Sequence, residues 1–329
     1  MDNKNMKQNK EERKGSFRGI TEDFAKIVRN HPVFQEFFLR HKDKVIVGIR
    51  DNYVNLYYNC DSIAKFSDTG GPVRAKIAPY YLGSDKKSSL ITIDSKSRDL
   101  SDSFETIIQR SDDRKKREKQ SQERLYIANN QNSSSNWFCI DVEYTRSVAG
   151  KETAEPWRFD LIAVSKNAPY RVALIELKYS FGAIGGSSGI TKHIRDFYEF
   201  HTNGSYRILL PELISIIKGL RLLGVDIPES IKEDLTVDDF CQKPEYYFIT
   251  LDNNPDENGN TPKMTMAGYL FGDETWGSRK ASTLVGKNGF RAVVKDNSFR
   301  PSFKFSKATL PDLGIDNIID SSLYEEGEY

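Results

Sequence analysis

Three charged side chains interrupt two apolar runs near the middle of this 329-residue chain. Asp160 lies in the run 158–164, and Glu176 and Lys178 lie in the run 171–179. Both runs are rich in branched residues and read as strands. Because a buried strand does not accept isolated charges without a partner, these residue types and their spacing indicate a polar site.

The register of the two strands brings the carboxylates together. The segment 165–170 is polar, contains Asn and Pro, and predicts a turn between antiparallel strands. A turn centred on Ala168 places Asp160 opposite Glu176, on the same face of the sheet. Lys178 is two residues further along and shares that face.

Two carboxylates at such a position require a cation between them, because like charges directly opposite each other destabilise a sheet. A hard divalent ion such as Mg²⁺ binds one or two carboxylates together with phosphate oxygens of a substrate. The alternative is that Lys178 neutralises one of the carboxylates in a surface ion pair.

An Asp followed about fifteen residues later by Glu-X-Lys, on two adjacent strands, resembles the PD-(D/E)XK nuclease superfamily. The matching residues are Asp160, Glu176 and Lys178, and the resemblance covers roughly residues 100–251. The residue before the Asp is Phe159 where the superfamily name has Pro. The resemblance implies a restriction-endonuclease-like core, an α/β (α+β) fold with a mixed central sheet flanked by helices.

The resemblance also implies roles for these residues. Asp160 and Glu176 would bind Mg²⁺, for which Mn²⁺ can substitute, together with the main-chain carbonyl of Leu177. Lys178 would orient or deprotonate the attacking water and stabilise the transition state. The expected activity is metal-dependent phosphodiester hydrolysis, with a DNA endonuclease in restriction or host defence favoured. The alternatives are a non-cleaving nucleic-acid-binding module on the same fold and a partner-binding protein.

A fourth acidic residue is expected at the site. The segment 137–144 reads as a strand, and pairing it with the Asp160 strand places Glu143 opposite Asp160. Glu143 is therefore the fourth catalytic candidate, and a cross-strand pair with Arg158 is the alternative. Members of the superfamily often add an acid from the helix before the sheet, and the candidates for that role are Glu105, Glu118 and Glu123.

Several basic residues are candidate nucleic-acid contacts. A glycine-rich loop, 181–189, and a helix, 190–200, follow the Glu-X-Lys strand. On this helix Lys192, His193, Arg195 and Glu199 are expected to face the site. Segment 278–308 carries eight basic residues against Asp296 alone, and its phenylalanines alternate with them. The predicted contacts are Lys192, Arg195, Arg279, Lys280, Lys287 and Arg291.

The whole chain divides into five regions by composition. These are a disordered polar arm, an N-terminal α+β region, the nuclease core, a β-rich basic region and an acidic tail, at 1–16, 17–97, 98–251, 252–308 and 309–329. The N-terminal region contains a hairpin over 44–58 and several tyrosines, which are either stacking surfaces for bases or half-buried strand residues.

Other elements are predicted from local signals. Thr21 is expected to cap a helix, and segment 65–72 reads as a loop. A single helix is expected from Ser101 to about 127, and 129–136 reads as a polar loop. Pro211 is expected to open a helix that ends at Gly224. An apolar strand, 245–251, returns the chain to the core sheet.

Composition excludes several classes of protein. No apolar run approaches the roughly 18–20 residues that span a bilayer, and the first fourteen residues lack the apolar segment of a secretory signal. The three cysteines are far apart, which favours a reducing, cytoplasmic compartment and argues against a zinc ribbon. The expected partner is nucleic acid, DNA rather than RNA, with no membrane, and a homodimer is left open.

Overall fold

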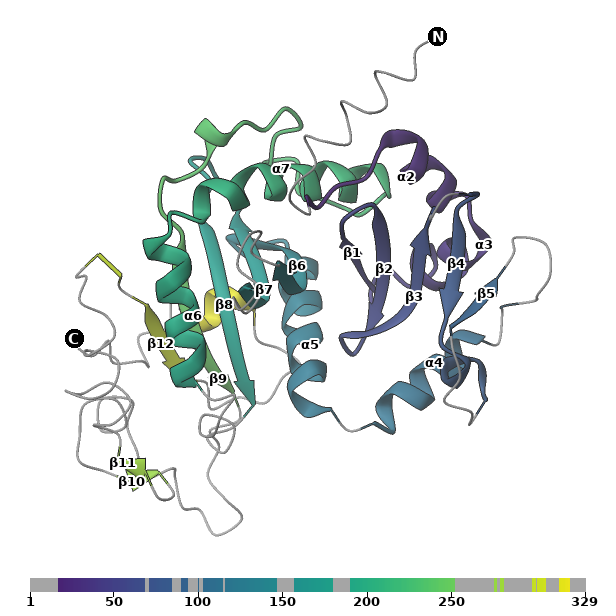
Figure 1. Cartoon of the computed structure of the whole chain (residues 1–329), viewed down its shortest axis with the longest axis horizontal. Helices are drawn as coiled ribbons and strands as arrows, with labels where there is room; N and C mark the ends of the chain where they lie inside the picture. Colours follow the sequence, from purple (N-terminus) through teal and green to yellow (C-terminus); the bar gives the residue numbers. More distant parts are fainter. Residues whose placement is uncertain are drawn as a thin grey trace. The chain divides into compact units, whose positions relative to one another are not determined.

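The computed structural model describes residues 17–68, 71–84, 90–93, 100, 103–114, 116–146, 157–179, 190–251, 275–276, 279–280, 298–299, 301–305 and 314–319. The protein is mixed α+β, with a five-stranded sheet in each of two compact units (Figure 1). Unit 1 comprises Met1–Asp113, Tyr144–Arg158 and Pro211–Ile227; unit 2 comprises Arg114–Glu143, Phe159–Leu210 and Pro228–Tyr329. The two units therefore interleave along the chain, unlike the consecutive regions drawn from composition.

The sheet of unit 1 is antiparallel, and its strands follow one another in sequence order. They are β1 (Ile46–Ile49), β2 (Tyr53–Tyr58), β3 (Asp61–Ser67), β4 (Arg74–Ile77) and β5 (Ile91–Ile93). The hairpin predicted over 44–58 is confirmed as β1 and β2. The expected loop over 65–72 is wrong in its first part, because β3 extends to Ser67.

The turn that opens β3 explains this difference. Asn59 and Cys60 connect β2 to β3 and have φ angles of 53° and 52°. Two central residues with positive φ are typical of a type I′ hairpin turn, which usually contains glycine. Because this turn contains none, the sequence pattern did not mark the start of a strand.

Helices cover one face of this sheet. They are α2 (Glu22–Arg29), α3 (Pro32–Phe34), the π-helical turn η1 (Gln35–Leu39) and α4 (Ser103–Asp112). Thr21 caps α2 by accepting a hydrogen bond from the Phe24 amide at 3.2 Å, as the sequence predicted. Phe34 meets the β3 residue Phe66 edge to face at 5.8 Å between ring centroids, so the apolar face of the sheet forms the core of unit 1.

Unit 2 contains the elements predicted to carry the site. Its sheet has the strand order β12-β9-β8-β7-β6, with β7 antiparallel to β8 and with β8, β9 and β12 mutually parallel. The bounds are β6 (Trp137–Arg146), β7 (Trp157–Ser165), β8 (Val172–Tyr179), β9 (Glu245–Leu251) and β12 (Ser302–Phe305). The predicted strands at 137–144, 158–164, 171–179 and 245–251 are thereby confirmed.

Three helices accompany this sheet: α5 (Arg117–Gln131), α6 (Ile190–Thr202) and α7 (Tyr206–Leu222), the last of which continues into unit 1. The expected single helix from Ser101 is in fact two helices, α4 and α5, and α5 extends into the predicted loop 129–136. Pro211 lies inside α7 and does not open it. The helix begins five residues earlier because Ser205, Tyr206 and the leucines that follow are buried and pack in the core.

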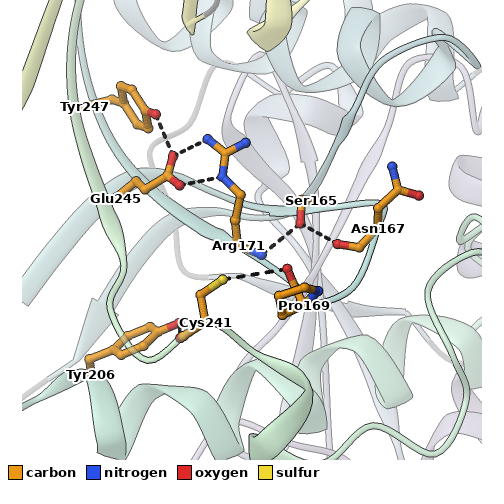
Figure 2. A network of polar contacts seen from close by, with 8 residues as sticks. All are labelled: Ser165, Asn167, Pro169, Arg171, Tyr206, Cys241, Glu245 and Tyr247. Atoms are coloured by element: carbon orange, nitrogen blue, oxygen red, sulfur yellow. Dashed lines mark hydrogen bonds and ion pairs between the residues drawn. The ribbon is translucent and has the colours of Figure 1, made fainter.

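A polar network fixes the turn end of the β7–β8 hairpin, which is the end remote from Asp160, Glu176 and Lys178 (Figure 2). The Ser165 hydroxyl accepts a hydrogen bond from the Arg171 amide at 2.8 Å and donates one to the Asn167 carbonyl at 3.0 Å. The Arg171 guanidinium binds both carboxylate oxygens of Glu245, at 2.5 and 2.7 Å, which ties β8 to β9. These contacts hold the two strands in one register.

That register is the predicted one. Residues 161–164 pair with residues 175–172 in reverse order, so the paired numbers add up to 336. One further step in the same register would place Asp160 opposite Glu176. The sequence-based alignment of the hairpin is therefore confirmed over its paired length.

The C-terminal part of the chain contributes to unit 2 more than its composition suggested. β12, from the segment expected to form a separate basic region, pairs with β9 in the core sheet. Helix α11 (Ile315–Ile319) lies in the expected acidic tail, but Ile315 and Ile318 are completely buried. The Ile315 amide donates to Asn129 Oδ1 on α5 at 3.1 Å, so this segment belongs to the core.

No helix among the described residues is both long and apolar enough to cross a bilayer. The remaining expectations for the polar arm 1–16 and the glycine-rich loop 181–189 lie outside the described residues.

Candidate active site

The hairpin and the strand after it bring the predicted residues together in unit 2. Lys178 Nζ lies 2.6 Å from Glu176 Oε1, and both side chains are at most 8% exposed. The ion pair named as the alternative is therefore present, but it is buried and does not lie on the surface. A buried pair is costly to desolvate, so its presence requires compensation from further charges or a ligand.

Asp160 is linked to this pair through the backbone. Its Oδ2 accepts a hydrogen bond from the Leu177 amide at 2.8 Å, at the residue between Glu176 and Lys178. The half-buried carboxyl group is thus held beside the Glu-X-Lys segment. The carbonyl of Leu177 remains a predicted metal ligand.

The surroundings of Asp160 and Glu176 disfavour the ionised form of both carboxyl groups. Burial raises the pKa of Asp160 to about 7, against the opposing effects of Lys178 and the Leu177 amide. Burial also raises the pKa of Glu176 well above its ordinary value, and the neighbouring Asp160 raises it further. Raised carboxyl pKa values in one small region are typical of functional sites.

Lys178 is held as a cation. Burial lowers its pKa, but Glu176, Asp160 and Glu118 together outweigh burial, so the net shift is upward. Deprotonation of water by Lys178, one of its two expected roles, would require a lowered pKa. The observed environment instead favours a positive charge that stabilises anions.

The helix before the sheet places one of its acidic residues beside the Glu-X-Lys segment. Glu118, in the first turn of α5, places Oε1 3.8 Å from Lys178 Nζ. Its charge also raises the pKa values of Asp160 and Glu176. Of the three helix candidates, Glu105 lies on α4 in unit 1 and Glu123 lies further along α5. Glu118 is therefore the helix residue that joins the cluster.

Glu143 also lies near the cluster, in an unusual backbone conformation. Its charge raises the pKa of Asp160, and its carboxylate forms an ion pair with Lys119 of α5 at 3.4 Å. Its φ angle of 51° is left-handed, so β6 departs from regular alternation at this residue. Non-glycine residues with such angles are concentrated at functional sites.

His193 also contacts this cluster, although it was not among the predicted catalytic or metal-binding residues. Its Nε2 lies 3.1 Å from Glu176 Oε1, and its side chain is only 14% exposed. The sequence signal was its place in the first turns of α6, where it was expected to face the site. Lys178 and His193 therefore approach the same oxygen of Glu176.

Two carboxylate oxygens remain for a ligand. Among the described residues, neither Asp160 Oδ1 nor Glu176 Oε2 accepts a hydrogen bond. When ionised, Asp160, Glu176 and Glu118 outnumber the single positive charge of Lys178, so a divalent cation would neutralise the group. The donor set thus suits Mg²⁺ or Mn²⁺, although no described group of three or more His, Cys, Asp or Glu side chains is already arranged around a metal position.

Among the predicted nucleic-acid contacts, only Lys192 and Arg195 have side chains within the described part of the chain. Lys192 forms an ion pair with Asp196 on α6 at 3.3 Å, and Arg195 is exposed on the same helix. Arg279 and Lys280 form β11 (Arg279–Lys280), which pairs with β10 (Thr275–Trp276). Lys287 and Arg291 lie outside the described residues.

Comparison with known proteins does not assign the chain to a family. No protein-family model, curated protein or solved structure gives a significant match to the chain.

Proposed function

We propose that the protein is a metal-dependent nuclease of the PD-(D/E)XK type, with DNA as the favoured substrate and endonucleolytic cleavage as the favoured reaction. A role in restriction or host defence would fit this activity. The proposal rests chiefly on one observation, the buried pair of Glu176 and Lys178 with the half-buried Asp160 held beside it. Buried charges of this kind are costly to desolvate, and carboxyl groups with raised pKa values that lie together favour a functional site.

The element order around the cluster supports the proposal. A helix with an acid in its first turn, α5, is followed by three neighbouring strands, β6, β7 and β8. A helical crossover then leads to β9, which is parallel to β8. This succession agrees with the restriction-endonuclease-like core implied by the resemblance.

Each side chain has a role in the proposed reaction. Asp160 and Glu176 would hold a divalent ion, which supplies charge neutralisation at the scissile phosphate and lowers the pKa of a bound water. Lys178 orients the attacking water and stabilises the negative charge that develops on the phosphate. His193 positions Glu176 through Oε1, and Glu118 adds to the larger effects of Glu176 and Asp160 that raise the pKa of Lys178.

A non-cleaving nucleic-acid-binding module is the second candidate. The observation in its favour is that the Lys178 ammonium already lies 2.6 Å from Glu176 Oε1, which neutralises part of the acidic charge without a metal. In that case the cluster would be a structural remnant of the catalytic motif.

A cleavage assay separates the two candidates. We expect the protein to degrade plasmid DNA with Mg²⁺ or Mn²⁺ and to be inactive in EDTA. Labelled single- and double-stranded DNA and RNA oligonucleotides, incubated in parallel, would identify the substrate. Asp160→Ala, Glu176→Ala and Lys178→Ala should each lower the cleavage rate by at least about 100-fold, the order of effect expected for charge stabilisation in a transition state.

The matched control is Lys243→Ala, which removes an exposed lysine from the same unit. This variant should cleave at the wild-type rate, and circular dichroism should show that all variants are folded. Metal-dependent cleavage by Lys178→Ala at the wild-type rate would overturn the assignment.

A further inference from the structure

A row of polar side chains crosses the sheet of unit 1 on the face opposite its apolar core. The register places Gly48, Asn55, Lys65, Lys76 and Thr92 side by side, one from each of β1 to β5. Side chains directly opposite each other lie on one face of a sheet. The adjoining row, Tyr53, Ser67 and Arg74, lies on the same face. We call these two rows the polar face.

The polar face carries positive charge and no acid. Lys65, Lys76 and Arg74 are its charged members, and among the described residues none of the three forms a salt bridge. Arg74 is exposed, whereas Lys65 and Lys76 are half-buried.

Lys65 and Lys76 are in an unfavourable position without a ligand. They are directly opposite each other on β3 and β4, and like charges in this arrangement destabilise a sheet. Burial lowers the pKa of Lys65, and the charge of Lys76 lowers it further. An anion that contacts both ammonium groups would relieve this repulsion.

Aromatic rings support the basic residues. Lys65 Nζ lies 3.7 Å from the centre of the Tyr53 ring, which orients the ammonium over the face. Tyr57 accepts hydrogen bonds from Arg50 at 2.9 Å and from Asn55 at 2.9 Å, so its ring is fixed beside the row. The lysines are therefore held in position by their neighbours.

We propose that the polar face of the β1–β5 sheet binds the phosphate backbone of nucleic acid, with Lys65, Lys76 and Arg74 as the phosphate contacts. Closely spaced basic residues on a half-buried surface neutralise successive phosphates. The proposal deepens the proposed function, because it names a substrate-binding surface separate from the candidate active site. It does not require that the protein cleaves its ligand.

The test is a binding titration with fluorescently labelled 30-nucleotide single-stranded DNA, RNA and duplex DNA in EDTA. We expect Lys65→Ala/Lys76→Ala to bind the preferred oligonucleotide on the order of tenfold more weakly than wild type at physiological salt. The slope of log K against log salt should fall by about 1.4 to 1.8, which corresponds to two lost phosphate contacts. The preferred strand type would show which source of phosphate the face accepts.

The control is Lys26→Ala/Lys44→Ala, which removes the same charge from exposed positions of unit 1. This variant should keep wild-type affinity and salt slope. Thermal unfolding should show that Lys65→Ala/Lys76→Ala is folded, and Lys65→Gln/Lys76→Gln provides a second test with longer side chains.

The outcomes also separate this inference from the nuclease assignment. Weakened binding by both double variants of Lys65 and Lys76, in a protein that does not cleave, would support the polar face and overturn the nuclease assignment. Wild-type affinity in these variants, or no binding of any oligonucleotide by the wild-type protein, would overturn the inference, whether or not the protein cleaves.

Discussion

At the scale of residues, the candidate site is a set of charges that oppose one another until a cation binds. Glu176 Oε1 contacts Lys178 at 2.6 Å and His193 at 3.1 Å, while Asp160 depends on the Leu177 amide. The pKa values of Asp160 and Glu176 are raised because burial makes their ionised forms unfavourable. Stability and activity should therefore respond in opposite directions to removal of one charge.

Asp160→Asn tests this opposition. At pH 8 the Asp160 carboxyl, with a pKa of about 7, is ionised in spite of its burial. The amide would remove the cost of desolvating this charge and its effect on Glu176, while its oxygen still accepts the Leu177 hydrogen bond. We expect the metal-free variant to be more stable than wild type by on the order of 1 kcal/mol, as measured by urea denaturation.

Magnesium should make the wild-type protein more stable than Asp160→Asn. Addition of Mg²⁺ should raise the unfolding temperature of the wild-type protein, because a ligand that binds only the folded state stabilises it. The same addition should have little effect on Asp160→Asn. An equal shift in both proteins would contradict the assignment of Asp160 as a metal ligand.

At the scale of elements, the two sheets use side-chain contacts to hold their registers. In unit 2, Ser165 and Arg171 fix the turn end of the β7–β8 hairpin, so that its other end can present Asp160, Glu176 and Lys178. In unit 1, Gly48 leaves room for the Tyr57 ring, which lies directly over the strand. The polar face depends on this close approach.

Gly48→Ala tests the packing of the polar face. A β-carbon at this position would lie 2.6 Å from Tyr57 Cε2 and 2.9 Å from Arg50 Nη2. The ring cannot move without loss of its hydrogen bonds with Arg50 and Asn55, so we expect a destabilisation of about 1–3 kcal/mol. Urea denaturation would measure it.

Gly71→Ala is the matched control, since a β-carbon there meets no atom within 4 Å. The difference between the two substitutions isolates the steric effect. If Gly48→Ala unfolded at the same urea concentration as Gly71→Ala, the Tyr57 ring would not be fixed over the strand.

At the scale of the whole molecule, the chain passes between the two units five times. The last strand segment of β6 and the second part of α7 complete unit 1. Glu212 on α7 is completely buried, accepts a hydrogen bond from the Tyr144 hydroxyl at 2.6 Å and forms an ion pair with Arg146. Arg18 stacks over the Tyr144 ring at 4.1 Å.

This interleaving predicts that the N-terminal fragment Met1–Asp113 does not fold alone. The fragment would lack the segments 144–158 and 211–227, and its residue Arg18 would lose both Tyr144 and Glu212. We expect a protease-sensitive chain without cooperative thermal unfolding, because exposed apolar surface would replace a packed core.

Co-expression with residues 114–329 is the control, since the missing segments can then pack against the fragment. A fragment that resists proteolysis and unfolds cooperatively by itself would show that 1–113 is an independent domain. In that case the segments from α7 and β6 would be dispensable for the core of unit 1.

The sequence by itself determined the charged hairpin, the strands around it and the cap of α2. These features depend on residues close together in the chain, and a turn, a cap or an alternating pattern is a local property. The pairing of residues 161–164 with 172–175 could be counted because one short turn fixes it. Glu118 was a named candidate, but its sequence neighbourhood could not separate it from Glu105 and Glu123.

Tertiary structure decided which distant residues meet these strands. The contacts of Glu118 and His193 with the Glu-X-Lys segment depend on how α5 and α6 pack, and no local pattern encodes helix packing. The same holds for the entry of β12 into the core sheet and for the row that joins Lys65 to Lys76. The chemistry of the site could be predicted from residue types, whereas its completion required non-local packing, which only the folded chain specifies.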